Sequence, residues 1–583
     1  MYPSLNQPGS RQPLPRVKPN ASTKMKSFPH LPLSGPVFGL PFLLAGLMPV
    51  GADVRLPHVF ADHMVLQSGS PVPVWGWADP GENLTVSFAG ESAASTADAS
   101  GRWQAELAPL PANALPHDLR IHGAKSDVTV HDVLVGEVWL AGGQSNMGLP
   151  LFAAHNAAEI IPQANDPLLR FYSVTKHTAA GPQADGVGQW HLSTPETARN
   201  FSAVAYFFAR EIRQDRHVPV AVLEAPWGGT DIETWISLEG LQAAPALTNP
   251  LARWEKALKD YEQVQLHPEL EKTYEADLKL WQKEVGPAYD AATKKYNEDK
   301  AAGRTVGPKP QPARPEPTNP DPMGMPSPSR RPSTPTVNYN GMIAPLAPYA
   351  LRGVIWYQGE NNGGRGLEYR DLFPRLIADW RRHWHRPDEL PFLFVQLPCN
   401  GADPTPVATQ GWPWLREAQF LTRKVPHTGM AITIDIGDPN NVHPADKVDV
   451  GHRLALLARH QVYGEELAAS GPLYHGYQVE AGGKIRVRFT ETGGGLTPGR
   501  QPWCAAGVKP FPTDRLTGFF VAGADRKWVE AGAEIDGDSV VVSSPQVPEP
   551  HAVRYDWANS PRGNLYNKAG LPAAPFRTDD WLK

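Results

Sequence analysis

The chain has 583 residues, which is too many for a single hydrophobic core and predicts two or three domains. Hydrophobic residues make up 41% and charged residues 20%, as in ordinary globular proteins, and the formal net charge is -5. This balance provides neither the basic surface that nucleic acids attract nor a polybasic membrane patch. We therefore expect no nucleic-acid partner and no membrane partner.

Residues 1–52 are predicted to be a leader with a signal peptide. A polar, proline-rich stretch precedes Met25 and Lys26, an apolar run follows at 37–48, and small residues lead to Ala52. This order is typical of a secretory signal, and the run is too short to span a bilayer. We expect an exported protein, periplasmic or extracellular; a buried helix is the alternative for this run.

Cysteine usage excludes one class of metal site and leaves a second question open. Cys399 and Cys504 are the two cysteines of the chain. Two cysteines so far apart cannot form a thiolate zinc module. In an exported protein, one long-range disulfide and two free buried thiols are both possible.

Residues 53–132 predict an N-terminal β module. Short β-type runs at 71–77, 84–88 and 128–130 are separated by turn residues such as Asp79-Pro80-Gly81. This spacing is typical of a β-sandwich-like fold.

The pattern changes at Val133 to long apolar runs that alternate with helical periodicity. The expected buried strands are 133–142, 221–225, 353–357, 392–396 and 430–435, and the expected helices include 203–213, 372–384 and 448–459. Alternating strands and helices predict an α/β fold with a parallel sheet. We assign it to two parts of the chain, 133–240 and 338–470.

Residues 241–337 are predicted to interrupt this fold, and residues 471–583 to follow it as a C-terminal β domain. The stretch 250–300 has apolar residues on one helical face, which indicates a helical hairpin, and a proline-rich tract at 308–335 predicts a flexible segment. The insertion either flanks the functional site or is a surface excursion. Strand patterns in the C-terminal part occur at 484–489, 519–522 and 539–543.

Four polar motifs follow the expected strands of the α/β fold. Gly143-Gln144-Ser145-Asn146-Met147 follows the first, and Trp227-Gly228-Gly229-Thr230 follows the second. Gln358-Gly359-Glu360-Asn361-Asn362 and the loop 435–444 with His443 follow two others. Each motif alone is explained as well by a turn, a helix cap or a structural histidine. Because the carboxyl ends of parallel strands meet at one edge, the four together predict a serine hydrolase site.

No metal or cofactor is expected. The histidine pairs His383 with His385 and His443 with His452 lack a matching pattern of carboxylates.

These motifs, together with Asn340-Gly341-Met342 and with His443-Pro444 and Lys447, resemble the sialate O-acetylesterase family of the SGNH (GDSL-like) hydrolases. The resemblance covers roughly residues 56–460. It implies a flavodoxin-like three-layer domain that cleaves O-acetyl esters of sugars without a metal.

Carried over residue by residue, the resemblance implies Ser145 as nucleophile and His443 as general base. The oxyanion hole would be formed by the Ser145 N–H, Gly229 and Gln358. Many SGNH enzymes have an aspartate three residues before the histidine, but Asn440 stands there in this chain. Asparagine cannot carry the charge that stabilises imidazolium. Glu360 and Asp438 are the candidate acids, Asp435 is a weaker one, and a Ser-His dyad is the alternative.

The expected partner is an acetylated glycan. We favour plant cell-wall polysaccharide of the xyloglucan or xylan type, because an exported chain with β modules and 18 tryptophans suits a polymer. Sialate is the alternative substrate, and a non-catalytic carbohydrate-binding protein is the alternative of another class. The sequence does not specify the oligomeric state.

Overall fold

The computed structural model describes residues 53–581, apart from residues 245, 302–305, 328–329, 402–410 and 503–513. The described residues belong to one compact unit that spans Ala52–Lys583. The expected leader 1–52 and Cys504 lie outside the described residues. Within the described part of the chain, no helix is long and apolar enough to cross a membrane.

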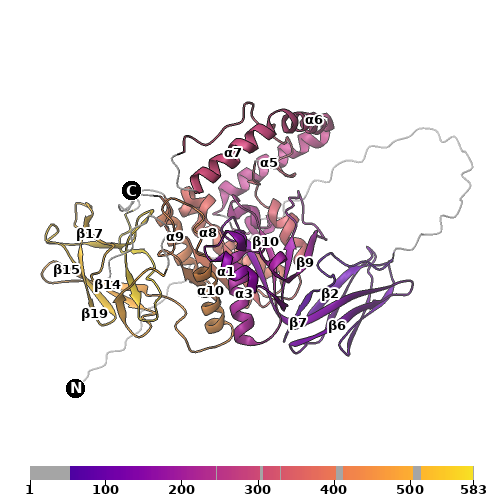
Figure 1. Cartoon of the computed structure of the whole chain (residues 1–583), viewed down its shortest axis with the longest axis horizontal. Helices are drawn as coiled ribbons and strands as arrows, with labels where there is room; N and C mark the ends of the chain where they lie inside the picture. The colour runs from indigo at the N-terminus through magenta and orange to yellow at the C-terminus, as the bar shows by residue number, and fades with distance from the viewer. Residues whose placement is uncertain are drawn as a thin grey trace, which may run out of the picture. The chain divides into compact units, whose positions relative to one another are not determined.

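A sheet of mainly parallel strands forms the centre of the fold (Figure 1). Its strands lie in the order β13-β12-β11-β7-β10-β8-β9, and only the pair β8 and β9 is antiparallel. The carboxyl ends of the parallel strands therefore meet at one edge. The strands are β7 (Asp127–Gly143), β8 (Asp166–Val174), β9 (Gly188–Ser193), β10 (Val220–Pro226), β11 (Gly353–Tyr357), β12 (Phe392–Gln396) and β13 (Thr428–Ile432).

The apolar runs predicted the centre of this sheet correctly. β11 and β12 have the expected bounds, and every residue of both strands is buried. β8 and β9 were not predicted. Polar residues such as Arg170 and Gln189 interrupt their apolar patterns, because these two strands lie toward one side of the sheet.

The strand β7 crosses the expected boundary between residues 132 and 133. Its first half pairs with β6, its residues 134–136 pair with β1, and its last seven residues pair with β10. One apolar core accordingly runs from the N-terminal strands into the central sheet. The N-terminal strands are β1 (Val65–Gln67), β2 (Val72–Trp77), β3 (Asn83–Phe88), β4 (Glu91–Thr96), β5 (Arg102–Leu107) and β6 (Asn113–His122).

The predicted helices at 203–213, 372–384 and 448–459 are confirmed as the greater part of α3, α8 and α10. α3 packs against α10, and α8 packs against α9. The Ser202 hydroxyl caps α3 by accepting the Ala205 N–H. The helices of this part are α1 (Ala157–Ile160), α2 (Pro195–Ala198), α3 (Ala203–Arg216), α4 (Leu238–Gln242), α8 (Gly366–His383), α9 (Trp412–Thr422) and α10 (Val448–Gln461).

The insertion contains three consecutive helices, which corrects the expected helical hairpin. They are α5 (Thr248–Leu266), α6 (Pro268–Glu284) and α7 (Gly286–Ala301) (Figure 1). A proline at the first turn of α6 and Gly286-Pro287 at the start of α7 divide the helical stretch, because proline is tolerated in a first turn and disfavoured inside a helix. The described part of the proline-rich tract forms neither helix nor strand, and Met323 and Val337 pack with Ala257 in a small separate core.

The C-terminal residues form antiparallel strands with a core of their own. Strand patterns at 484–489, 519–522 and 539–543 are confirmed as β15, β17 and β20. The strands are β14 (Leu473–Glu480), β15 (Lys484–Thr490), β16 (Leu496–Pro498), β17 (Phe519–Ala522), β18 (Val529–Glu530), β19 (Gly532–Asp536), β20 (Ser539–Ser543), β21 (Ala552–Tyr555), β22 (Leu565–Asn567) and β23 (Phe576–Arg577).

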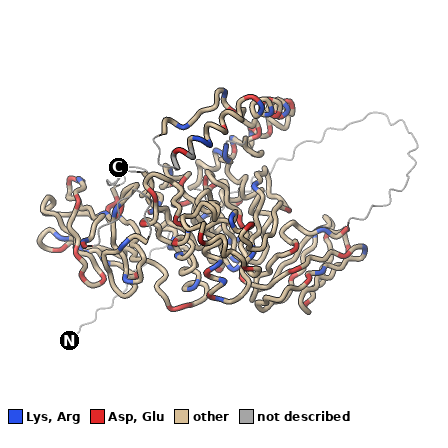
Figure 2. Tube along the Cα trace, in the orientation of Figure 1, with Lys and Arg blue, Asp and Glu red and all other residues tan. Residues whose placement is uncertain are grey.

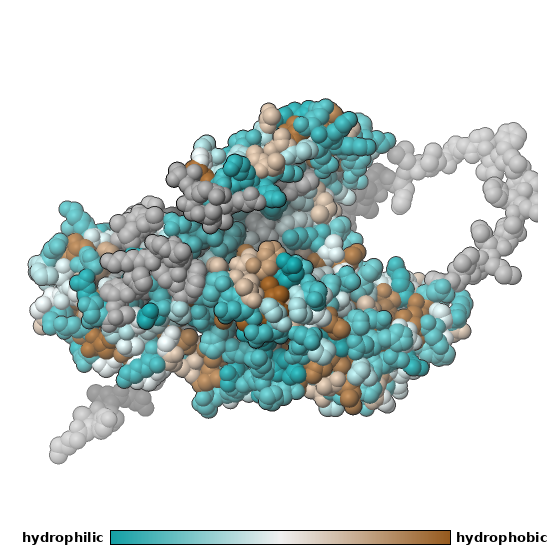
Figure 3. Space-filling view, viewed as in Figure 1, coloured by the Kyte–Doolittle hydropathy of each residue, from teal (hydrophilic) through white to brown (hydrophobic). Residues whose placement is uncertain are grey.

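The surface has mixed polarity. Basic and acidic residues are interspersed along the described trace (Figure 2). On the face drawn in Figure 3, hydrophobic residues form small groups among hydrophilic ones. This mixture agrees with the nearly balanced charge of the sequence.

The fully buried side chain of Arg416 on α9 joins the α/β fold to the C-terminal strands. Its guanidinium donates hydrogen bonds of 2.6–2.9 Å to the carbonyl oxygens of Leu397, Pro398, Ala558 and Asn559.

We expect Arg416→Ala to lower the free energy of unfolding by at least about 3 kcal/mol, because it leaves the carbonyl groups of Leu397, Pro398 and Ala558 without their donor. The Asn559 carbonyl keeps the N–H of Asn400. Denaturant unfolding measures the change. Arg488→Ala is the matched control and should change the free energy of unfolding by less than about 0.5 kcal/mol, because the Arg488 side chain donates to the Gln478 side chain at the exposed surface. Equal effects of the two substitutions would contradict this account of the junction.

Candidate active site

Ser145 lies on a tight turn directly after β7. The N–H of Gly148 donates to the carbonyl of Gln144 at 2.9 Å and closes the turn. At the end of the strand, Gly143 has a φ of 135°, and a Cβ on this residue would lie 2.1 Å from the carbonyl oxygen of Tyr357 on β11. Only glycine permits this approach of the two strands. The turn therefore lifts Ser145 above the carboxyl edge of the sheet.

His443 lies in the loop between β13 and α10 and contacts Ser145. Its Nε2 is 2.7 Å from the Ser145 Oγ. The loop is fixed beside it, because the His443 backbone N–H donates to the Asn441 side chain at 3.0 Å. Two residues almost 300 positions apart, after strands β7 and β13, are thus brought together at one edge of the sheet, as the sequence predicted.

The surroundings of His443 favour its neutral form. Burial lowers the pKa of the imidazole below its usual 6.5, and the nearby Lys447 ammonium lowers it further. A neutral imidazole with its lone pair at Nε2 accepts the hydroxyl proton of Ser145. The pair is therefore arranged to activate the serine oxygen.

A buried polar cluster lies behind this pair, centred on Asn146. The Asn146 Nδ2 donates to Glu360 Oε1 at 2.5 Å and to the carbonyl of Val442 at 2.8 Å, while its Oδ1 accepts from Lys447 Nζ at 2.7 Å. Burial raises the pKa of Glu360, and burial lowers the pKa of Lys447 to about 7. Because Val442 directly precedes His443, this cluster ties the serine turn to the histidine loop.

None of the three expected acids contacts the imidazole. Glu360 accepts from Asn146, Asp438 accepts the backbone N–H of Asn440, and Asp435 pairs with Arg453 and Tyr566. Among the residues that the structure describes, Ser145 is the only hydrogen-bond partner of the His443 ring. Neither Glu360 nor Asp438 therefore contacts the imidazole among the described residues, in which Ser145 and His443 form a hydrogen-bonded pair.

Backbone N–H groups beside Ser145 are available to an oxyanion. A Cβ on Gly228 would lie 3.0 Å from the Ser145 Cβ, so the two residues pack directly together, and Gly229 follows with a φ of 75°. In the described part of the chain, no hydrogen bond uses the N–H groups of Ser145, Gly228 or Gly229.

The expectation for Gln358 requires a correction. Its side-chain nitrogen donates to the carbonyl of Thr230 at 3.1 Å and to Asn362 Oδ1 at 2.8 Å. Both amide hydrogens are therefore used, and none remains for an oxyanion. Gln358 instead holds the loop that carries Gly229.

Ser145 and His443 open into a cavity of about 630 Å³. Three groups of residues line it besides this pair. They are the strand ends and the start of α3 (Ser173, Val174, Lys176, Asn200, Ser202, Glu224), the two loops beside Ser145 (Gly148, Leu149, Pro150, Pro226, Trp227, Gly228) and the insertion (Met325, Pro326, Ser327, Arg330, Arg331). The insertion is thus one wall of the cavity, and Glu224 is a buried carboxylate that sequence reasoning missed.

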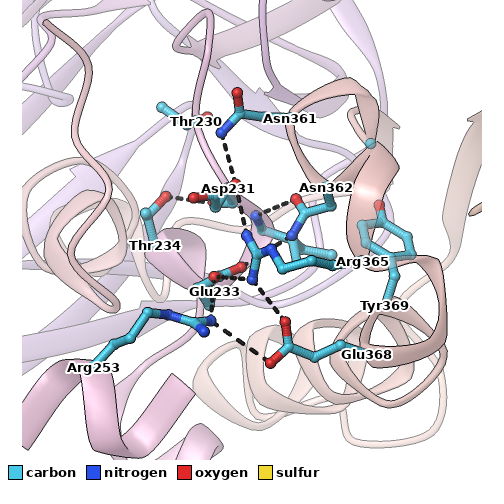
Figure 4. Close-up of polar contacts among 12 residues, drawn as sticks. Thr230, Asp231, Glu233, Thr234, Arg253, Asn361, Asn362, Arg365, Glu368 and Tyr369 are labelled. Atoms are coloured by element: carbon cyan, nitrogen blue, oxygen red, sulfur yellow. Dashed lines mark hydrogen bonds and ion pairs between the residues drawn. The ribbon is translucent and has the colours of Figure 1, made fainter. Parts of the chain in front are cut away.

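A network of ion pairs anchors the insertion beside the site (Figure 4). Arg253 on α5 reaches the fully buried Glu233 at 2.6 Å and Glu368 at 3.7 Å. Arg365 pairs with the same two carboxylates at 2.7 Å and with Asp231 at 2.8 Å. The network continues through Asn362, which donates to Glu233 at 3.1 Å and accepts from Gln358. It therefore connects α5 with the loops that follow β10 and β11.

Metal ligands and reactive thiols do not gather in the described part of the chain. It contains no group of three or more His, Cys, Asp and Glu side chains suited to a metal ion. Cys399 is buried with a free thiol, and burial raises its pKa to about 11.

Comparisons with known proteins give consistent results. Residues 333–459 match the model of a carbohydrate esterase family described as sialic acid-specific acetylesterase. The mouse sialate O-acetylesterase is 30% identical over 75% of this chain and 80% of its own length, and the human one is 28% identical over 74% and 76%. The crystal structure of a carbohydrate acetylesterase from Xanthomonas citri is similar with a TM-score of 0.70 and 36% identity, over 91% of this chain and all of that one.

We expect Arg253→Ala to loosen the insertion while the rest of the fold stays intact. Arg253 is 40% exposed, so its loss should lower the free energy of unfolding by about 1 kcal/mol or less. Cleavage by chymotrypsin within residues 241–337 should become at least about threefold faster. Lys256→Ala, which removes an exposed pair with Asp260 on the same helix, should leave the rate unchanged. Equal cleavage of the two variants would show that the network does not anchor the insertion.

Proposed function

Since the chain belongs to the sialate O-acetylesterase family of carbohydrate esterases, we propose that Ser145 is its nucleophile and His443 its general base. The observation that carries this proposal is the 2.7 Å contact between Ser145 Oγ and His443 Nε2 at the wall of a cavity. The fold proposed with it is the three-layer SGNH domain in two parts, 133–240 and 338–470, with β modules at 53–132 and 471–583.

The reaction follows from these positions. His443 Nε2 takes the hydroxyl proton while Ser145 Oγ attacks the acetyl carbonyl. The N–H groups of Ser145 and Gly229 hold the resulting oxyanion. Protonated His443 then gives its proton to the departing sugar oxygen, and water, deprotonated by the same imidazole, releases acetate from the serine.

In a catalytic triad an acid orients the imidazole, so a Ser-His pair without that acid needs other contacts to orient it. In this chain, Asn146 holds the carbonyl of Val442 and Asn441 holds the N–H of His443. These bonds hold both polar groups of the peptide unit that directly precedes the His443 Cα. Orientation of the base therefore comes from its backbone, and the neutral state comes from burial.

The substrate that we propose is an acetylated plant cell-wall polysaccharide or its oligosaccharides, of the xyloglucan or xylan type. Trp227 is among the residues that line the cavity, and tryptophan is a residue type suited to packing against a sugar ring. Export, proposed from the apolar run at 37–48, would place the enzyme with such polymers.

Sialate is the second candidate, and one observation favours it. Lys176, Arg330 and Arg331 line the same cavity. These cations suit a carboxylate on the sugar. Acetate release from acetylated xyloglucan, acetylated xylan and O-acetylated sialic acid, compared at equal ester concentration, distinguishes the two candidates.

We expect Ser145→Ala to lower acetate release by at least about 10⁴-fold with an unchanged melting temperature, because the attacking oxygen is lost and no buried contact is created. Acetate is measured enzymatically on the preferred glycan. His443→Ala should lower it similarly. A folded Ser145→Ala protein with substantial activity would overturn the assignment.

In the pH profile of the rate, we expect the loss of activity on the acid side to have its midpoint below the usual pKa of histidine. Neutral His443 is the base, and its pKa in the fold lies below 6.5, so kcat at saturating substrate should fall as the pH drops through a midpoint below 6.5. Steady-state rates from pH 4 to pH 8 measure it, with melting temperature as the control for acid unfolding. A midpoint above 6.5 would contradict the role of burial and Lys447.

A further inference from the structure

Glu224 is a buried carboxylate in the same cavity that the proposed reaction does not use. It lies on β10, four residues before Gly228, and the residue is 7% exposed. Burial raises its pKa to about 7. A carboxylate at this depth needs hydrogen-bond donors, because desolvation disfavours its charge.

The protein donates fewer hydrogen bonds to the Glu224 carboxylate than this group can accept. The backbone N–H of Ser202 donates to its Oε1 at 2.7 Å, and the Ser173 hydroxyl lies 3.4 Å from its Oε2. In the part of the chain that the structure describes, no lysine or arginine pairs with Glu224. An ionised carboxylate has about four acceptor positions, so about two remain, and Glu224 is one of the residues that line the cavity.

Its place in the sheet determines where these positions lie. Glu224 pairs in register with Ser173 on β8 and with Ala141 on β7, two residues before Gly143. It also lies at the N-terminus of α3, whose N-cap is Ser202 and whose dipole favours an anion there. The N–H of Ser202 at the helix end donates to Oε1 of Glu224. Among the described residues, the donor to Oε2 is the Ser173 hydroxyl, at the long distance of 3.4 Å.

We propose that Glu224 is a specificity-determining residue that accepts hydrogen bonds from free hydroxyl groups of the sugar beside the acetylated one. This inference rests on the proposed function of Ser145 and His443. The substrate class that it names is a partially acetylated sugar with a free hydroxyl next to the ester. A sugar without that hydroxyl offers no donor and leaves the buried carboxylate unmatched.

The test compares substrates that differ by one hydroxyl group. The probes are monoacetylated methyl β-xyloside and its deoxy analogues, in each of which one free hydroxyl is replaced by hydrogen. With the wild type, removing the recognised hydroxyl should raise KM at least about tenfold, because hydrogen bonds to charged groups are among the stronger ones.

The variants are Glu224→Gln, which keeps the shape and an acceptor for the Ser202 N–H, and Glu224→Leu, which removes all polar contacts. Both should raise KM for the parent xyloside, with a smaller change in kcat. The KM values for the parent and for the deoxy analogue that lacks the recognised hydroxyl should then differ by no more than about threefold. The control is Glu211→Gln on α3, whose carboxylate pairs with His452, and it should discriminate as the wild type does. Full discrimination in Glu224→Gln, or none in the wild type, would overturn the inference. Equal losses of kcat on all probes would assign Glu224 a structural role.

Failure of this inference is distinguishable from failure of the proposed function. Ser145→Ala is assayed on the same parent xyloside. If acetate release survives in that variant, the proposed function fails and this inference falls with it. If release depends on Ser145 while discrimination does not depend on Glu224, only the present inference fails.

Discussion

The side chain of Asn146 makes the contacts on which the site depends. One amide group bonds to Glu360 after β11, to the backbone of Val442 after β13, and to Lys447 at the start of α10. Its own position follows from the turn after β7, where Gly143 brings the backbone against β11. Three separate strand ends are thereby held at fixed distances, and the 2.7 Å contact between Ser145 and His443 is a consequence of that arrangement.

Burying the charged groups of this cluster costs desolvation free energy. Lys447 is fully buried with an uncharged amide as its hydrogen-bond partner, and one oxygen of Glu360 is buried with no partner at all in the described part of the chain. Well-packed apolar side chains often stabilise a fold as well or better than buried charges do. Stability therefore does not explain the cluster, whereas the position and the neutral state of His443 do.

The sequence predicted the parts of the fold that depend on local pattern. Continuous apolar runs located β11 and β12, and the joint occurrence of motifs after strands predicted that Ser145 and His443 lie close together, as they do. What it missed depends on tertiary contacts. The orientation of Gln358 toward Thr230 and Asn362, the paired state of Asp435 with Arg453, and the burial of Glu224 at the start of α3 carry no local signal. The helix breaks at Pro268 and Gly286-Pro287, in contrast, do carry a local signal, because proline is tolerated in the first turn of a helix and disfavoured inside one.

The placement of β11 beside β7 has a consequence for the protein during its synthesis on the ribosome. One edge of β7 is covered by β10 soon after synthesis, but its other edge waits for residue 353, beyond the whole insertion. At common rates of translation, that interval lasts on the order of 10–40 s. During this time, a long apolar strand offers unpaired backbone groups to any neighbouring chain. The nascent protein is therefore most vulnerable to aggregation while α5, α6 and α7 are being made, and the ordering of β11 ends that period.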